Sequence, residues 1–204
     1  MLNVAGVACR RGGRALFSDL SFSVQPGELL HIQGENGSGK TSLLRILVGL
    51  SRQETGRVLW NNSDIHEIRE EYATSLLYLG HQPAVKDDLT VAENLAMSCR
   101  IAGLEPSFTA IETALAHAGL ARRVTLPARV LSQGQRRRLA LARLWLDSRP
   151  LWVLDEPFTA LDVSATALLE EWLERHLKTG GMVVLTTHQP PSIHDDFLRV
   201  LNLS

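Results

Sequence analysis

The stretch Gly34-Glu35-Asn36-Gly37-Ser38-Gly39-Lys40-Thr41 decides how this chain of 204 residues folds. It has the form G-x-x-x-x-G-K-[ST], in which glycines surround a lysine and a hydroxyl residue. The apolar run Leu29-Leu30-His31-Ile32 before it predicts a short buried strand. The run Ser42-Leu43-Leu44-Arg45-Ile46-Leu47-Val48 after it has apolar residues at helical spacing, and Gly49 follows as an end signal. A strand, a glycine-rich loop and a helix are therefore predicted in succession.

Each residue type in this stretch suits the binding of phosphate. Glycines let the backbone adopt positive φ and approach a ligand closely. Successive N–H groups then form a concave nest, to which the following helix adds its positive end. Lys40 can reach the outer phosphates of a nucleotide, and the Thr41 hydroxyl suits Mg²⁺, with Ser42 as its polar neighbour. We therefore predict nucleotide binding by residues 34–42, in preference to a glycine turn that only starts a helix.

Composition limits the classes of protein to which the chain can belong. A length of 204 residues fits one domain with a sizeable core, and 45% apolar residues are usual in soluble globular proteins. A net charge of -1 gives no strong field that would attract nucleic acid. Cys9 and Cys99 are too few for a disulfide framework, so we expect core thiols in a reducing compartment. We find neither a signal-peptide pattern nor an apolar run near the length of about 20 residues that a membrane helix needs.

Hydrophobic patterning divides the chain between strands and helices. Residues 2–33 predict strands and turns, and further strands are expected at 56–60, 75–79, 151–154, 182–186 and 198–203. Residues 84–148 predict a helical insertion, with capping boxes that begin at Thr90 and Thr109 and a third helix that Ser132 opens. Another amphipathic helix is expected over 164–178.

The run Leu151-Trp152-Val153-Leu154-Asp155-Glu156 places two carboxylates directly after four apolar residues. This pattern predicts a buried parallel strand that delivers acids at its carboxyl end, where open α/β sheets bind ligands. Asp155 would hold Mg²⁺ through water, and Glu156 would polarise a water molecule for attack on a γ-phosphate. Alone, the pair would better suit helix capping, but the glycine-rich loop upstream favours catalysis. His188 follows the expected strand 182–186, and we favour a γ-phosphate contact for it over an ordinary surface role.

A full set of motifs gives the chain a family resemblance. Leu131-Ser132-Gln133-Gly134-Gln135 resembles the signature motif of ATP-binding-cassette (ABC) ATPases. The other motifs follow the family's order. Residues 34–41 resemble the Walker A loop, and Gln82 resembles the Q-loop glutamine. Residues 151–156 resemble the Walker B strand, Thr159-Ala160-Leu161-Asp162 resembles the D-loop, and His188 resembles the switch histidine. The resemblance implies one ABC ATPase domain over residues 1–204 with the α/β P-loop NTPase fold. Its RecA-like core would span about 1–83 and 149–204, with a mostly parallel sheet, flanking helices and an N-terminal antiparallel β region. A helical subdomain would span about 84–148.

The resemblance also implies a mechanism, cofactors and partners. Two copies would form a head-to-tail homodimer with two ATP molecules between them, and hydrolysis to ADP and phosphate would open it. An integral membrane permease subunit would dock at residues 83–89 and the helix after Thr90. By position, the resemblance implies that Glu156 and His188 are catalytic and that Thr41, Gln82 and Asp155 bind Mg²⁺. It implies that the partner's nucleotide is contacted by Ser132, Gln133, Gly134 and Gln135, and that Asp162 belongs to the D-loop.

Some positions depart from the family pattern. Gln133 stands where the signature usually has glycine, and its side chain would either crowd the partner's nucleotide or add a hydrogen bond. Arg10-Arg11 stands where an aromatic residue usually stacks on adenine, so either an arginine plane or Phe17 would take that role. We interpret the run Arg136-Arg137-Arg138, on the first turns of a helix, as mostly a solvated face. We expect no nucleic-acid partner, because no aromatic residues are interleaved with the run.

Four stretches narrow the resemblance to the ATPase subunit of the bacterial cytochrome c maturation system, the haem exporter. They are Tyr78-Leu79-Gly80-His81-Gln82-Pro83, Leu141-Ala142-Arg143-Leu144-Trp145-Leu146, Leu151-Trp152-Val153-Leu154-Asp155-Glu156-Pro157-Phe158-Thr159-Ala160 and Leu185-Thr186-Thr187-His188-Gln189. This subgroup implies a peripheral protein on the cytoplasmic face of the bacterial inner membrane. The alternatives are an ABC transporter ATPase for another substrate, or a soluble ABC ATPase of repair or translation. The single cassette and the lack of sustained heptads argue against the soluble class.

Overall fold

The computed structural model describes residues 1–203, which fall into two compact units. The first unit comprises residues 1–78, 149–156 and the chain from 173 onward. The second comprises residues 79–148 and 157–172.

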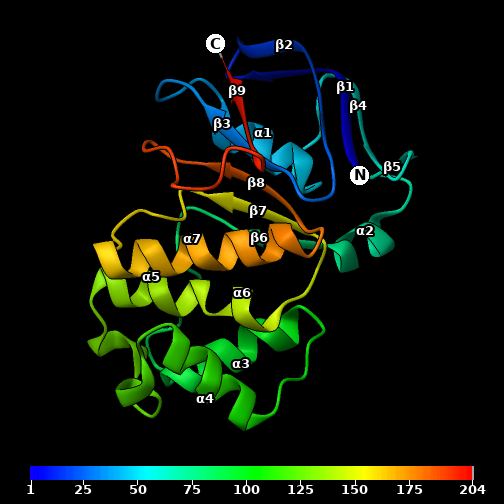
Figure 1. Ribbon diagram of the computed structural model, residues 1–204. Coiled ribbons are helices and arrows are strands. Elements are labelled where there is room, and N and C mark those ends of the chain that lie inside the picture. The colour runs from blue at the N-terminus through cyan, green and yellow to red at the C-terminus, as the bar shows by residue number, and fades with distance from the viewer. Residues whose placement is uncertain (204) are drawn as a thin grey trace. The chain divides into compact units, whose positions relative to one another are not determined.

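A five-stranded sheet forms the centre of the first unit, with strand order β6-β7-β8-β3-β9 (Figure 1). The pairs β7–β8, β8–β3 and β3–β9 are parallel. Every residue of β7 and β8 is buried, as expected of parallel strands that are covered on both faces. The strands predicted around this sheet are confirmed, with the bounds β3 Leu29–Gln33, β6 Leu76–Leu79, β7 Leu151–Asp155, β8 Met182–Thr186 and β9 Leu198–Asn202.

Helix α1 (Lys40–Leu47) and, within the first unit, the C-terminal end of helix α7 (Val163–Lys178) pack against this sheet. Helix α1 packs against β7 and β8 and buries Leu43, Leu44, Ile46 and Leu47. It ends as predicted, because Gly49 adopts φ +73° directly after the C-cap Val48. On α7, the His176 ring stacks on the Trp152 ring of β7, with ring centroids 3.8 Å apart.

An antiparallel sheet makes up the rest of the first unit, with order β2-β1-β4-β5. Its strands are β1 Leu2–Arg11, β2 Arg14–Val24, β4 Thr55–Trp60 and β5 Ser63–Asp64. Helix α2 (Arg69–Ser75) follows it, and the sequence patterns did not predict this helix. Its N-cap Ile68 offers no side-chain cap, and the buried Tyr72 anchors it instead, donating from its hydroxyl to the Leu47 carbonyl at 2.7 Å.

The second unit is mainly helical, with α3 Val91–Ile101, α4 Phe108–His117, α5 Gln133–Leu141 and α6 Arg143–Leu146. Short 3-10 turns, η1 Ala121–Arg123 and η2 Ala128–Val130, connect α4 to α5. Helix α3 packs against α4, α5 and α6 (Figure 1). No helix within residues 1–203 combines the length and the apolar character needed to cross a membrane.

The predicted helix starts in this unit are partly confirmed. Thr90 and Glu93 form the expected capping box of α3. The capping box predicted at Thr109 is wrong, because α4 begins two residues earlier with Ser107, whose hydroxyl accepts from the Ala110 N–H at 3.2 Å. The single helix expected after Ser132 is two helices, which meet at Ala142.

Two glycines face each other where β1 and β4 pair irregularly. The register shifts between Ala5 and Ala8 of β1, and Gly6 and Gly56 adopt φ +61° and +82° there. A Cβ on Gly56 would lie 2.4 Å from the Ala5 carbonyl oxygen and from the Gly6 backbone. Backbone atoms cannot move aside as a flexible side chain can, so this crossing requires glycine.

We expect Gly56→Ala to lower the free energy of unfolding by about 3 kcal/mol or more, through strain and overlap together. Gly180→Ala is the matched control, because Gly180 has φ +85° and no atom within 4 Å of the position of a Cβ. The control should lose about 1 kcal/mol from strain alone. Urea unfolding of both variants measures the difference, and equal losses would contradict the role of the close backbone contact.

Candidate functional site

The glycine-rich loop between β3 and α1 has the geometry of an anion-binding nest. Gly37 and Gly39 adopt φ +85° and +105°, and Gly39 is the N-cap of α1. A Cβ on Gly34 would lie 2.5 Å from the Leu203 carbonyl oxygen, so no larger residue fits at that position. Residues 34–37 are exposed, which leaves the mouth of the loop open to a ligand.

Two side chains of the loop have groups suited to a phosphate. The Lys40 ammonium donates to the Gly34 and Glu35 carbonyl oxygens at 2.7 and 3.1 Å, so it folds back over the loop. The Ser38 hydroxyl is buried and finds no hydrogen-bond partner among residues 1–203. A buried hydroxyl without a partner is costly. The loop therefore carries groups whose hydrogen bonding an anionic ligand would complete.

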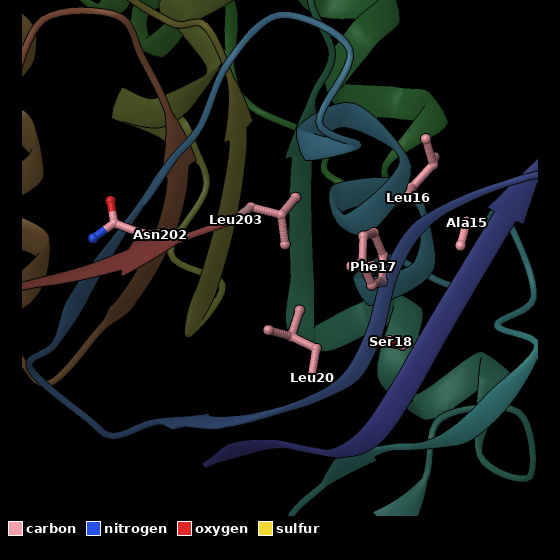
Figure 2. A pocket seen from close by; sticks show the side chains of 7 residues that line it. All are labelled: Ala15, Leu16, Phe17, Ser18, Leu20, Asn202 and Leu203. Carbon is pink, nitrogen blue, oxygen red and sulfur yellow. The ribbon is translucent and has the colours of Figure 1, made fainter.

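A pocket of about 330 Å³ adjoins the loop (Figure 2). Leu16 and Phe17 of β2 lie against Gly39, while the Leu203 carbonyl lies against Gly34. The residues that line it are Ala15, Leu16, Phe17, Ser18, Leu20, Asn202 and Leu203, so both apolar and polar groups face the space. Such a pocket can hold the uncharged part of a ligand whose phosphates occupy the loop. Of the candidates for stacking on adenine, Phe17 lines the space beside the loop. The Nε of Arg10 lies 3.8 Å from the Glu54 Oε2 instead.

The acidic end of β7 is fixed by one threonine of β8. Asp155 is only 2% exposed, and its Oδ1 accepts from the Thr186 hydroxyl at 2.8 Å. The backbone N–H of Glu156 donates to both the carbonyl and the hydroxyl oxygens of Thr186, each at 3.1 Å. Glu156 adopts φ +50°, a strained value for a residue with a side chain. Thr186 thus holds both carboxylate-bearing residues in place.

The structure brings Glu156 and His188 together. The His188 Nε2 lies 3.6 Å from the Glu156 Oε1, within the same unit as the phosphate loop. The Glu156 side chain is 12% exposed and the His188 side chain 63% exposed. A sheltered carboxylate beside an accessible imidazole can orient a water molecule and donate a proton to an anion.

The motif that resembles the ABC signature lies in the second unit, at the start of α5. The Ser132 hydroxyl accepts from the Gln135 N–H at 3.3 Å, and the Gln135 side chain accepts from the Ser132 N–H at 3.0 Å. Gln133, which departs from the family pattern, is exposed. A Cβ on Gly134 would lie 2.7 Å from the Ala160 carbonyl oxygen, so the helix start and residues 159–162 are in close contact.

Asp162 lies one residue before α7 and caps that helix. Its carboxylate accepts from the Ala165 N–H and from the Ser164 hydroxyl, both at 2.8 Å. These hydrogen bonds hold the pKa of the Asp162 carboxyl below its usual value, because they stabilise the charged form. The Ala165 and Ser164 bonds thus keep Asp162 ionised and its loop ordered.

The interpretation of the arginine run as a solvated face is wrong for Arg137, which is 3% exposed. Its guanidinium donates at 3.2 Å to the carbonyl oxygens of Gly80, His81 and Pro157. It therefore fixes the segment directly before Gln82 and the segment directly after Glu156. Arg136 forms an ion pair with Asp87. Sequence spacing could not show that Arg137 is buried, because its carbonyl partners belong to irregular backbone segments that lie far from it along the chain.

The fold and these motifs define an ABC-type ATPase, and the family model described as ABC transporter matches residues 17–159. The cytochrome c biogenesis ATP-binding export protein CcmA of Nitrosomonas europaea is 54% identical over 93% of this chain and 89% of its own length. The protein of the same name from Escherichia coli K12 is 46% identical over 100% of this chain and 97% of its own length. This chain belongs to the CcmA family of cytochrome c biogenesis ATP-binding export proteins, and it is an ATPase that acts in transport.

Solved structures support the fold. A structure described as the ATP-binding subunit of an ABC transporter superposes with a TM-score of 0.84 at 24% identity, covering 99% of this chain and 86% of that one. An ATP-binding cassette in a dimeric post-hydrolysis state, bound to ADP and phosphate, superposes with a TM-score of 0.79 at 23% identity. That match covers 93% of this chain and 88% of the other. The predicted fold class is therefore confirmed.

We expect Thr186→Val to lower the free energy of unfolding by about 1–3 kcal/mol, because it removes a hydroxyl that Asp155 and Glu156 both use while keeping the side-chain shape. Thr113→Val is the control, since the Thr113 hydroxyl is exposed and only donates to the Thr109 carbonyl of its own helix. The control should change stability by less than about 0.5 kcal/mol. Urea unfolding of the two variants tests this expectation, and equal stability would show that the Thr186 hydroxyl does not support the acidic strand end.

Proposed function

We propose that this chain is the ATP-hydrolysing, energy-coupling subunit of a transporter that exports or delivers haem across the bacterial inner membrane for c-type cytochrome biogenesis. One observation carries the catalytic part of this proposal. Strands β3, β8 and β7 are parallel, with Ile32 in register with Thr186 and Thr186 in register with Asp155. The glycine-rich loop, His188 and Glu156 therefore follow strands that end at the same edge of one sheet.

The residues at this edge take separate roles in our proposal. The loop N–H groups and Lys40 bind the β- and γ-phosphates, and the pocket beside Phe17 receives the nucleoside. Thr41 and Asp155 hold Mg²⁺, for which the exposed loop hydroxyl and the oriented carboxylate are suitable oxygen donors. When bound, Mg²⁺ neutralises charge on the phosphates. The assignment of Gln82 to Mg²⁺ stays a prediction.

Hydrolysis itself is assigned to Glu156 and His188. Glu156 accepts a proton from a water molecule as the water oxygen forms a bond to the γ-phosphorus. The bond between the γ-phosphorus and the bridging oxygen breaks, and ADP and phosphate leave. His188 donates a hydrogen bond to the γ-phosphate and helps to fix its position. The 3.6 Å separation of the two side chains supports this division of roles.

The partners are also proposals. We propose that two copies form a homodimer, in which residues 132–135 of each copy contact the other's nucleotide and the D-loop around Asp162 lies near them. A dimeric structural neighbour supports this arrangement. An integral membrane permease would hold the chain at the cytoplasmic face of the inner membrane. We place its docking surface at residues 83–89 and the start of α3, where Asp87 and Asn94 order the loop. The division into a RecA-like core and a helical subdomain stays a prediction.

Glu156→Gln should lower kcat for ATP by about 10²–10⁴-fold, because the amide cannot accept the water proton. It should still bind ATP and accumulate as an ATP-bound dimer, which size-exclusion chromatography with bound-nucleotide analysis would detect. Glu112→Gln, on the exposed face of α4, is the control and should hydrolyse ATP at the parental rate. Parental ATPase activity in Glu156→Gln would remove Glu156 from the mechanism.

The transport role is tested by affinity purification of the chain from detergent-solubilised membranes of its own host, followed by mass spectrometry. We expect membrane proteins of cytochrome c maturation to be recovered with it. Recovery of an unrelated permease would keep the ATPase mechanism and remove haem delivery. Recovery of ribosomes or repair factors without a membrane protein would contradict the transporter role.

A further inference from the structure

A buried histidine on β3 has no part in the mechanism above. His31 is 1% exposed and lies three residues before Gly34. Its Nε2 lies 3.1 Å from the Thr187 carbonyl oxygen, and its Nδ1 lies 3.2 Å from the Gln33 amide nitrogen. Both ring nitrogens therefore have partners, and the partners come from two different segments of the chain.

The partners decide where the ring proton resides. A carbonyl oxygen can only accept, so the Nε2 must carry the proton and donate to Thr187. In the neutral ring the Nδ1 is then an acceptor, and the Gln33 amide donates to it. Because Gln33 lies two positions after His31 on the same strand, both side chains point to the same face of the sheet. The order of donation is from Gln33 to His31, and from His31 to the Thr187 carbonyl.

The Thr187 carbonyl belongs to the peptide bond that joins Thr187 to His188. It lies one residue beyond the end of β8, where the parallel register with β3 stops at the pair Ile32 and Thr186. Sheet pairing therefore no longer orients this peptide. Thr187 is nevertheless buried, so its carbonyl needs a donor from within the protein. His31 is the side chain that supplies one.

We infer that His31 is a positioning residue for ATP hydrolysis, which fixes the peptide before His188 and so keeps the His188 ring beside Glu156. This inference rests on the proposed roles of His188 and Glu156. The hydrogen bond from His31 stops the peptide from rotating toward another donor. A rotation would carry the His188 ring away from its place 3.6 Å from the Glu156 carboxylate. Loss of position of this kind lowers the rate of the chemical step more than it lowers nucleotide affinity.

The first test compares His31→Leu with His31→Gln. Leucine fills the buried site without a donor, whereas the glutamine amide nitrogen can take the place of the Nε2 and donate to Thr187. We expect His31→Leu to lower kcat by about 10–100-fold with KM for ATP within about twofold of the parent, and His31→Gln to recover most of kcat. If His31 served only to fill the core, His31→Leu would keep the parental kcat and His31→Gln would not. Parental kcat in His31→Leu overturns the inference.

A double-mutant cycle with His188→Ala separates this inference from the proposed function. If His188 acts as proposed, His188→Ala is slow, and adding His31→Leu to it lowers kcat by less than about twofold further. Full additivity of the two losses would show that His31 acts independently of His188 and would overturn the inference. Parental activity in His188→Ala would instead remove His188 from the mechanism, and His31 with it.

A further variant keeps the test decisive if His31→Leu does not fold. His31→Asn retains a polar side chain, but its amide nitrogen occupies the place of the Nδ1 and cannot reach the Thr187 carbonyl. Thermal unfolding identifies which variants are folded before kinetics are measured. We expect folded His31→Asn to show the same loss of kcat, at unchanged KM, as His31→Leu. Parental kcat in folded His31→Asn contradicts the positioning role.

Discussion

The complete burial of the two central strands β7 and β8 is the constraint on which the rest of the structure depends. Strands β7 and β8 have no exposed residue, so polar groups on these strands are restricted to the ends or must be hydrogen-bonded inside. The carboxyl ends of β3, β7 and β8 lie at one edge of the sheet. The glycine-rich loop, the carboxylates of Asp155 and Glu156, and His188 follow these strand ends. Thr186 is fully buried, yet its hydroxyl joins Asp155 and Glu156. The candidate catalytic residues therefore lie directly beside the buried core, at the ends of its strands.

Much of this arrangement could be predicted from the sequence, because it depends on local patterns. Apolar runs predicted the parallel strands, glycine spacing predicted the loop, and the capping residues Thr90 and Ser132 predicted two helix starts that the structure confirms. Helix α2 was missed because its anchor is the Tyr72 hydroxyl on Leu47, a tertiary contact rather than a local signal. The start of α4 was misplaced because Ser107 and Thr109 are both good caps, and the choice between them depends on backbone geometry.

The parts of the site that sequence could not show are those that depend on strand order. His31 looked like one more residue of an apolar run, and its contact with Thr187 exists only because β3 lies beside β8. Arg137 looked like a solvated charge, and its carbonyl partners lie 20 to 57 positions away along the chain. In both residues a side chain satisfies backbone carbonyls that regular structure leaves without donors.

The folded-back position of Lys40 has a consequence for the choice of ligand. Its ammonium is bonded to the Gly34 and Glu35 carbonyls, so a phosphate that contacts Lys40 would have to displace these two hydrogen bonds. A ligand gains only the difference between a charge-assisted bond to phosphate and the bonds that it displaces. Anions with one weak charge gain little from this exchange, whereas a chain of phosphates gains at several donors together. If the loop binds phosphate as we propose, the exchange at Lys40 favours a polyphosphate over an anion of single charge.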